Sequence, residues 1–120
     1  MPGMEWPGTL EAVPEVDIET HGADDAVHRT TIWPVVDGGD VYVRSLRGTA
    51  GRWYQEATAS PDVVLHVAGE SVPVQAVPAP DVESIGRANA GYQRKYAESP
   101  SLGTMTRDEI LGTTLRLEPR

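Results

Sequence analysis

The four residues Asp37-Gly38-Gly39-Asp40 constrain the fold of this chain more than any other part of its sequence. Glycine tolerates the positive φ angles of a tight β-hairpin turn, and paired glycines between two β-favouring runs are typical of one. The flanking runs are His28–Val36, rich in Thr, Ile, Trp and Val, and Val41–Leu46. We therefore predict a β-hairpin. Pro34 should mark an edge position or a bulge in it, because proline cannot donate a ladder hydrogen bond.

Further segments show the period-two alternation of half-buried strands. These predicted strands are Val16–Thr20, Val63–Ala68, Ser71–Val77 and Thr113–Glu118. Three helices are expected: Arg52–Ala59, one that begins after the N-cap Asp81, and a short one from the capping-box pair Thr106 and Glu109 to Gly112. The resulting order, β-β-β-α-β-β-α-α-β, indicates a mainly β chain with short helices (α+β), arranged as a six-stranded antiparallel barrel.

The length of 120 residues fits one domain. Residues 1–12, rich in Pro and Gly, are predicted as an N-terminal arm, and residues 13–120 as a single barrel domain. The first residues contain no apolar stretch, so we expect no secretory signal. No apolar run approaches the ~20 residues of a membrane span. The absence of cysteine excludes disulfides and thiolate sites. We expect a cytoplasmic protein without membrane partners.

The distribution of charge points to a small anionic ligand. A net charge of −8 disfavours nucleic acid as a partner, because that binding is driven by phosphate neutralisation. Yet Arg44, Arg47 and Arg52 fall close together, in a chain whose only lysine is Lys95. A local cationic patch on an acidic protein favours an anionic small molecule. The alternative is that these arginines are simply solvated at a strand end.

Several reaction classes are excluded by absent motifs. The chain has neither a Gly-rich dinucleotide fingerprint nor a phosphate loop with its lysine. His21, His28 and His66 have no metal-ligand spacing, so no metal site is predicted. A Ser-His-Asp arrangement can be assembled only by free choice of residues. An enzyme with so little side-chain chemistry of its own would borrow a cofactor.

The stretch Val41–Tyr54 combines features of a phosphate site. A strand delivers Arg44 and Ser45 to its end, and Gly48 and Gly51 permit close approach of the backbone to a ligand. A helix that begins near Gly51 offers free N–H groups and a positive dipole end to an anion. The aromatic residues Trp33, Tyr42, Trp53 and Tyr54 could flank a ring system. A phosphate tail and an aromatic head are the two parts of a flavin-type cofactor. The alternative is that these aromatic residues form core or lid.

Three patterns carry a family resemblance: His28-Arg29-Thr30-Thr31-Ile32-Trp33, then Asp37 through Ser45, then Gly51-Arg52-Trp53-Tyr54 with Pro61-Asp62-Val63. Together they resemble the FMN-binding split-barrel superfamily. More narrowly, they are similar to deazaflavin-dependent nitroreductase-like proteins and to a neighbouring family of uncharacterised small bacterial proteins. The resemblance covers roughly residues 14–77. It implies a split β-barrel, a deazaflavin or FMN as cofactor, and a possible homodimer.

The resemblance also implies roles for particular residues. Ser45, Arg47, Gly48 and Arg52 would contact the cofactor phosphate. The residues expected near the ring are Thr31, Ile32, Trp33, Tyr42, Val43, Arg44 and Trp53. Relatives often carry a lysine in the loop before the Trp-Tyr pair, where this chain has arginines.

The leading hypothesis is a flavin- or deazaflavin-dependent oxidoreductase that passes hydride to a small organic acceptor. Tyr54 and Tyr92 are candidate proton donors, without further support from the sequence. One alternative is a non-catalytic barrel that binds a small ligand or cofactor. Another is a cofactor-free barrel enzyme of a biosynthetic pathway, in which Trp33, Tyr42 and Tyr54 shape a hydrophobic pocket.

Overall fold

Seven strands, four α-helices and two 3-10 turns make up the described part of the chain, which is residue 6 and residues 8–120 of a computed structural model. The strands are β1 (Val16–His21), β2 (Val27–Ile32), β3 (Val35–Asp37), β4 (Asp40–Val43), β5 (Asp62–Val67), β6 (Glu70–Pro78) and β7 (Leu115–Pro119). The helical elements are α1 (Gly8–Ala12), η1 (Gly48–Ala50), α2 (Arg52–Ala59), α3 (Val82–Lys95), α4 (Leu102–Met105) and η2 (Asp108–Thr113).

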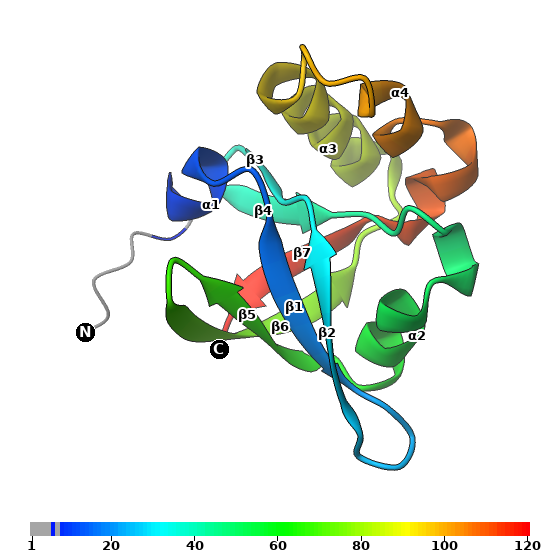
Figure 1. Ribbon diagram of the computed structural model, residues 1–120. Coiled ribbons are helices and arrows are strands. Elements are labelled where there is room, and N and C mark those ends of the chain that lie inside the picture. Colours follow the sequence, from blue (N-terminus) through cyan, green and yellow to red (C-terminus); the bar gives the residue numbers. More distant parts are fainter. Residues whose placement is uncertain (1–5, 7) are drawn as a thin grey trace.

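The strands form one antiparallel sheet in the order β2-β1-β5-β6-β7-β4-β3. The sheet curls into a half-barrel, with α3 and α4 at one side and α2 at another (Figure 1). The connection from β4 to α2 runs between these helices. The prediction of a mainly antiparallel β chain with short helices is confirmed.

The predicted number of six strands is wrong. The predicted strand His28–Val36 breaks at Trp33 and Pro34, so that β2 and β3 are separate strands. Pro34 has no N–H for a ladder and restricts the residue before it to particular backbone angles. Ile32 pairs with Val16 of β1, whereas Val35 pairs with Tyr42 of β4. The break therefore sends the chain from one end of the sheet to the other.

The hairpin turn lies where the glycine pair predicts it. Gly38 and Gly39 have φ angles of 60° and 84°, and Asp37 pairs with Asp40 across the turn. The returning strand is shorter than the predicted Val41–Leu46, because it ends at Val43. Beyond that point the backbone N–H of Ser45 donates to the hydroxyl of Thr113 instead of a neighbouring strand, at 3.1 Å.

All three predicted helices are present, the third as the 3-10 helix η2. Helix α2 covers the predicted residues, and α3 begins after Asp81, whose carboxylate accepts from the backbone N–H of Ser84 at 3.0 Å. The predicted capping box of the third helix is wrong. Thr106 donates its hydroxyl to the carbonyl of Leu102 in α4, at 3.0 Å, and the residue that precedes η2 is Arg107.

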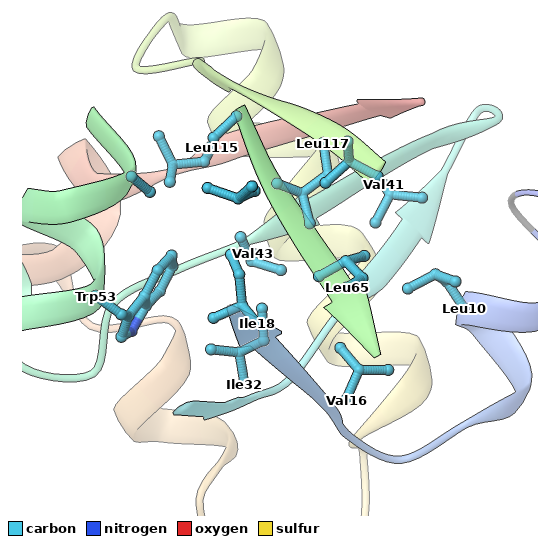
Figure 2. Packing of buried hydrophobic residues seen from close by; sticks show 14 of the residues in the cluster. Leu10, Val16, Ile18, Ile32, Val41, Val43, Trp53, Leu65, Leu115 and Leu117 are labelled. Atoms are coloured by element: carbon cyan, nitrogen blue, oxygen red, sulfur yellow. The ribbon is translucent and has the colours of Figure 1, made fainter. Parts of the chain in front are cut away.

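Two clusters of apolar side chains hold the elements together. The larger cluster fills the inside of the curl, where residues such as Ile18, Leu65 and Leu115 meet Trp53 of α2 (Figure 2). The smaller cluster lies between the sheet and the helices α3 and α4. Its members are Val35, Tyr42, Ala79, Ala88, Tyr92 and Met105. Strand β4 contributes to both clusters, with Val41 and Val43 in the larger and Tyr42 in the smaller.

The second half of the predicted N-terminal arm is not irregular. It contains α1, whose Leu10 is buried in the larger cluster. The remainder of the arm, residues 1–5 and residue 7, lies outside the described residues. Among the described helices, none has the length and apolar character needed to cross a membrane.

Candidate anion-binding cleft

A cleft of about 390 Å³ lies at the point where the chain leaves β4. Four segments form its walls: the end of β2 and the residues after it, the segment between β4 and η1, the start of α2, and the end of α4. The lining residues are Thr30, Thr31, Ile32, Trp33, Arg44, Ser45, Leu46, Arg47, Gly51, Arg52, Trp53 and Met105. The lining therefore combines arginines, hydroxyl groups and apolar side chains.

Eight of the eleven residues predicted to bind a cofactor lie in this lining. They are Thr31, Ile32, Trp33, Arg44, Ser45, Arg47, Arg52 and Trp53. Tyr42, Val43 and Gly48 do not. Tyr42 is buried under α3 and Val43 lies inside the curl, because successive side chains of a strand point to opposite faces. Gly48 is buried in η1, next to Ile110 and Glu109.

Of the other four lining residues, Gly51 was already expected to allow close approach of the backbone, and the sequence prediction of the site missed Thr30, Leu46 and Met105. Thr30 shares a face of β2 with Ile32, so the period of the strand could have found it. Leu46 lies between two predicted residues. Met105 comes from α4, more than fifty positions along the chain, and no local pattern of the sequence places it here.

The hydroxyl of Ser45 is a buried polar group without a partner. The residue is 1% exposed, and its Oγ has no hydrogen bond in the described structure. A Cβ built on Gly51 would overlap this Oγ, so only glycine leaves the oxygen its place. Gly51 is also the N-cap of α2, where no side chain caps the helix. The Ser45 hydroxyl and the uncapped N–H groups of α2 thus lie together, an arrangement that suits an anion.

Arg44 is the most deeply buried charged residue of the cleft, at 2% exposed. Its guanidinium donates to the side chains of Thr114 and Asn89, at 2.9 and 2.6 Å, and to the carbonyls of Met105 and Ile85, both at 3.1 Å. The ring of Tyr92 lies 5.4 Å away. All these partners are neutral, and burial lowers the pKa of Arg44.

The arginines of the described chain fall into two groups. Those away from the cleft pair with carboxylates: Arg29, Arg87, Arg94, Arg116 and Arg120. Arg44, Arg47, Arg52 and Arg107 have no carboxylate within ion-pair distance among residue 6 and residues 8–120. Arg44, Arg47 and Arg52 line the cleft. Arg107 lies beside it, because its guanidinium donates to the carbonyl of Leu46, which is also a lining residue. The arginines without carboxylate partners in the described chain are therefore gathered at one place.

Neither candidate proton donor lies in the cleft. The Tyr92 hydroxyl is buried and donates to the carbonyl of Trp33 at 2.9 Å, and burial raises its pKa. Tyr54 packs against the larger core cluster. The described lining contains no Asp, Glu, His, Lys or Tyr. A ligand in this cleft therefore meets fixed positive charge and hydroxyl groups, but no side chain that titrates near neutral pH.

The histidines that accept or donate hydrogen bonds do so outside the cleft. His28 Nδ1 lies 3.0 Å from the carboxylate of Glu56, and His66 Nε2 lies 2.9 Å from that of Glu19. His66 is therefore a half-buried histidine whose ring nitrogen has a hydrogen-bond partner. The described residues include no group of three or more His, Cys, Asp or Glu side chains that could hold a metal ion.

Comparison with solved structures identifies the fold. Campylobacter jejuni ChuZ matches with a TM-score of 0.75 at 11% identity, over 94% of this chain but only 50% of that one. The F420-H2 dependent reductase FDR-A matches with a TM-score of 0.63 at 18% identity, over 88% of this chain and 93% of that one. HutZ, the heme storage protein from Vibrio cholerae, matches with a TM-score of 0.60 at 10% identity, over 94% of this chain and 86% of that one. The fold is therefore a split β-barrel like theirs.

Comparison by sequence identifies a family but no characterised relative. A family model described as an uncharacterized protein conserved in bacteria (DUF2255) matches residues 8–117. No curated protein matches the chain. This chain spans half the length of the ChuZ chain that it resembles in fold.

Proposed function

From the premise that the chain belongs to the DUF2255 family of bacterial proteins and has the split-barrel fold, we propose that its cleft binds a flavin-type cofactor, a deazaflavin or FMN. The protein would act as an oxidoreductase that passes hydride to a small organic acceptor. The observation that carries the proposal is the gathering of Arg44, Arg47, Arg52 and Arg107, all without carboxylate partners in the described chain, around one cleft.

The end of the cleft at Ser45 and the start of α2, here called the outer end, fits a phosphate. Ser45 Oγ is buried without a partner, and it lies directly against Gly51, the N-cap residue of α2. Arg47 and Arg52 are exposed and can each form charge-assisted hydrogen bonds, which are stronger than neutral ones. We assign Ser45, Arg47 and Arg52 to the phosphate.

The apolar wall of the cleft fits a flat ring. Ile32, Trp33 and Met105 supply it. Trp33 is held in place, because its ring stacks on that of Tyr96 with centroids 5.1 Å apart and its carbonyl accepts from Tyr92. A wall that is rigid before binding costs less ordering entropy when the ligand arrives.

A bound cofactor of this type would supply the hydride, and the chain would supply binding and orientation. Arg47, Arg52 and Ser45 would fix one end, while Trp33 and Ile32 would shield a ring from water. Since the described lining holds no acid that titrates near neutral pH, the proton that completes a reduction would come from water. The pH dependence of such a reaction would then reflect the ligands rather than the protein.

Binding without turnover is the second candidate. The same absence of a proton donor in the described lining favours it. One protein of similar fold, HutZ, is named as a storage protein. A cofactor-free enzyme has less support, because Tyr42 and Tyr54, which were expected to shape its pocket, are not among the lining residues.

The proposal is tested by titrating the purified chain with FMN and with a deazaflavin, and following the quenching of cofactor fluorescence. We expect micromolar binding of at least one. Arg52→Ala should weaken it about tenfold. The matched control is Arg29→Ala, which removes an exposed arginine that pairs with Asp17 outside the cleft and should leave affinity unchanged.

Three results would separate the candidates. Absence of binding by both cofactors rejects the redox function. Equal affinity of Arg52→Ala and the unmodified chain rejects the phosphate assignment. Binding with no acceptor able to oxidise the reduced cofactor favours the non-catalytic candidate.

A homodimer is proposed as well. Strand β2 pairs only with β1 among the described strands, so the backbone groups of its other edge have no strand partner, as at an edge that could meet a second copy of the chain. Light scattering on a size-exclusion column measures the mass directly, and 13.0 kDa would reject the dimer.

A further inference from the structure

Arg44 and Ser45 are neighbours in sequence but face different parts of the molecule. The Arg44 side chain reaches Ile85 and Asn89 of α3 and the carbonyl of Met105 at the end of α4. The Ser45 hydroxyl lies against Gly51 at the start of α2. Both residues line the cleft. The cleft therefore has one end at Arg44, beside α3 and α4, which we call the inner end, and another at Ser45, beside α2, the outer end. The phosphate assigned to the outer end leaves the inner end unexplained.

The guanidinium of Arg44 is a buried charge that only neutral groups surround: four hydrogen-bond acceptors and the ring of Tyr92. Burial of a charge without a counterion is costly, and buried cations in proteins are usually paired. Here the hydrogen-bond acceptors are a hydroxyl, an amide and two carbonyls. They use four of the five N–H groups of the guanidinium. One N–H, on the nitrogen that donates to Ile85, has no acceptor among the described residues.

The surroundings of Arg44 exclude a carboxylate from the protein itself. No Asp or Glu belongs to the described lining of the cleft. Arg47 and Arg52 add positive potential to the same space, which attracts an anion and repels a cation. Trp33 and Met105 flank this end with apolar surface, which suits a flat, conjugated body.

We propose that the inner end of the cleft is a second anion subsite, in which Arg44 binds the carboxylate of the acceptor. The substrate class is then small, flat organic acids. This inference rests on the proposed function, because it names the acceptor of that same site. It makes Arg44 a specificity-determining residue, and separates its role from those of Ser45 and Arg52.

The test uses trans-cinnamate and its neutral isostere trans-cinnamamide as probes, with calorimetry on the full chain and no cofactor present. Cinnamate should bind about tenfold more tightly than the amide, because the amide can accept a hydrogen bond but carries no negative charge to balance that of the guanidinium. Saturating inorganic phosphate should leave cinnamate bound, since phosphate occupies the outer end. Equal binding of the two probes, or displacement of cinnamate by phosphate, would overturn the proposal.

Two arginine variants locate the subsite. Arg44→Gln should abolish the preference for cinnamate over cinnamamide. Arg52→Ala is the matched control at the outer end, and should keep that preference while phosphate binding is lost. A preference that survives Arg44→Gln, or that vanishes in Arg52→Ala, contradicts the assignment. If Arg44→Gln does not fold, the comparison of the two probes and the phosphate competition on the unmodified chain decide the question.

Failure of this inference is distinguishable from failure of the proposed function. A chain that binds FMN or a deazaflavin but shows no preference for cinnamate retains the proposed function and loses the second subsite. A chain that prefers cinnamate but binds neither cofactor loses the redox function and keeps Arg44 as a carboxylate-binding residue.

Discussion

Ser45 and Gly51 approach each other so closely that a methyl group on Gly51 would overlap the Ser45 hydroxyl oxygen. The backbone at Gly51 has φ of −66°, which any residue can adopt, so the need for glycine here is one of space rather than of backbone conformation. The hydroxyl is one of two buried side-chain polar atoms without a partner in the described structure. Such a group in a native protein calls for an explanation, and a bound anion supplies one.

The first prediction concerns this contact. Gly51→Ala should turn the Ser45 hydroxyl away and weaken the binding of FMN about tenfold, while the chain still folds, because a serine side chain can rotate. Fluorescence titration measures the affinity and urea unfolding the stability. Gly86→Ala is the control: a Cβ there meets nothing within 4 Å, so we expect a gain of about 1 kcal/mol from helix propensity and no change in affinity.

A double variant tests whether the two residues act through each other. In Ser45→Ala the overlap with an added methyl group is largely removed, so Gly51→Ala should have little further effect on FMN affinity in that background. If the losses of FMN affinity in the two single variants add in the double variant, Gly51 affects binding independently of the Ser45 hydroxyl.

The second prediction concerns Tyr92, whose hydroxyl supports Trp33 rather than the chemistry of the cleft. Tyr92→Phe removes the hydrogen bond to the Trp33 carbonyl and should lower the free energy of unfolding by about 1 kcal/mol. Turnover with any acceptor should persist, since the hydroxyl is not a proton donor there. Tyr54→Phe, at a partly exposed side chain, should change neither quantity. Loss of turnover in a stably folded Tyr92→Phe protein would restore Tyr92 as a candidate catalytic residue.

The third prediction concerns acid stability through Glu56. Burial raises the pKa of this carboxyl, but the hydrogen bonds from Thr20 and His28 outweigh burial, so its pKa lies below the usual value. The stabilisation is then complete above the ordinary glutamate pKa and is lost as pH falls through the lowered one. Urea unfolding of Glu56→Gln between neutral pH and pH ~3 should show a shallower loss of stability than the unmodified chain. Parallel pH profiles would reject this role.

The fourth prediction concerns Lys95, the only lysine. Its ammonium donates to the carbonyls of Leu10 and Pro34, at 2.7 and 2.6 Å, and burial lowers its pKa to about 8. Selective ¹⁵N labelling of lysine gives a single side-chain signal, whose titration midpoint should lie near this value. A midpoint at the usual lysine pKa would contradict the prediction.

The lowered pKa of Lys95 has a consequence for stability. Between a pH of about 8 and the ordinary lysine pKa, the unfolded chain holds a proton that the folded chain has released. The contribution of Lys95 to the free energy of unfolding therefore rises with pH in this window. In Lys95→Met this rise should be absent.

Local features of the sequence predicted much of the fold and part of the site. The Gly38-Gly39 turn, helix α2 and the N-cap Asp81 are confirmed, because each depends on interactions between residues a few positions apart. The cluster of arginines after β4 was evident for the same reason. The strand Val41–Leu46 was predicted too long, because its end is set by the distant residue Thr113.

The sequence by itself determined which residues form the turn, the short helix and the arginine-bearing segment between them, since hydrogen bonding and sterics over short separations suffice for these. Only the tertiary structure decided that Pro34 sends β2 and β3 to opposite ends of the sheet, and that Met105 completes the cleft. Only the tertiary structure, too, decided which arginines remain unpaired. The partners of Arg44 lie 41 to 70 positions away, and such contacts depend on how the whole sheet curls.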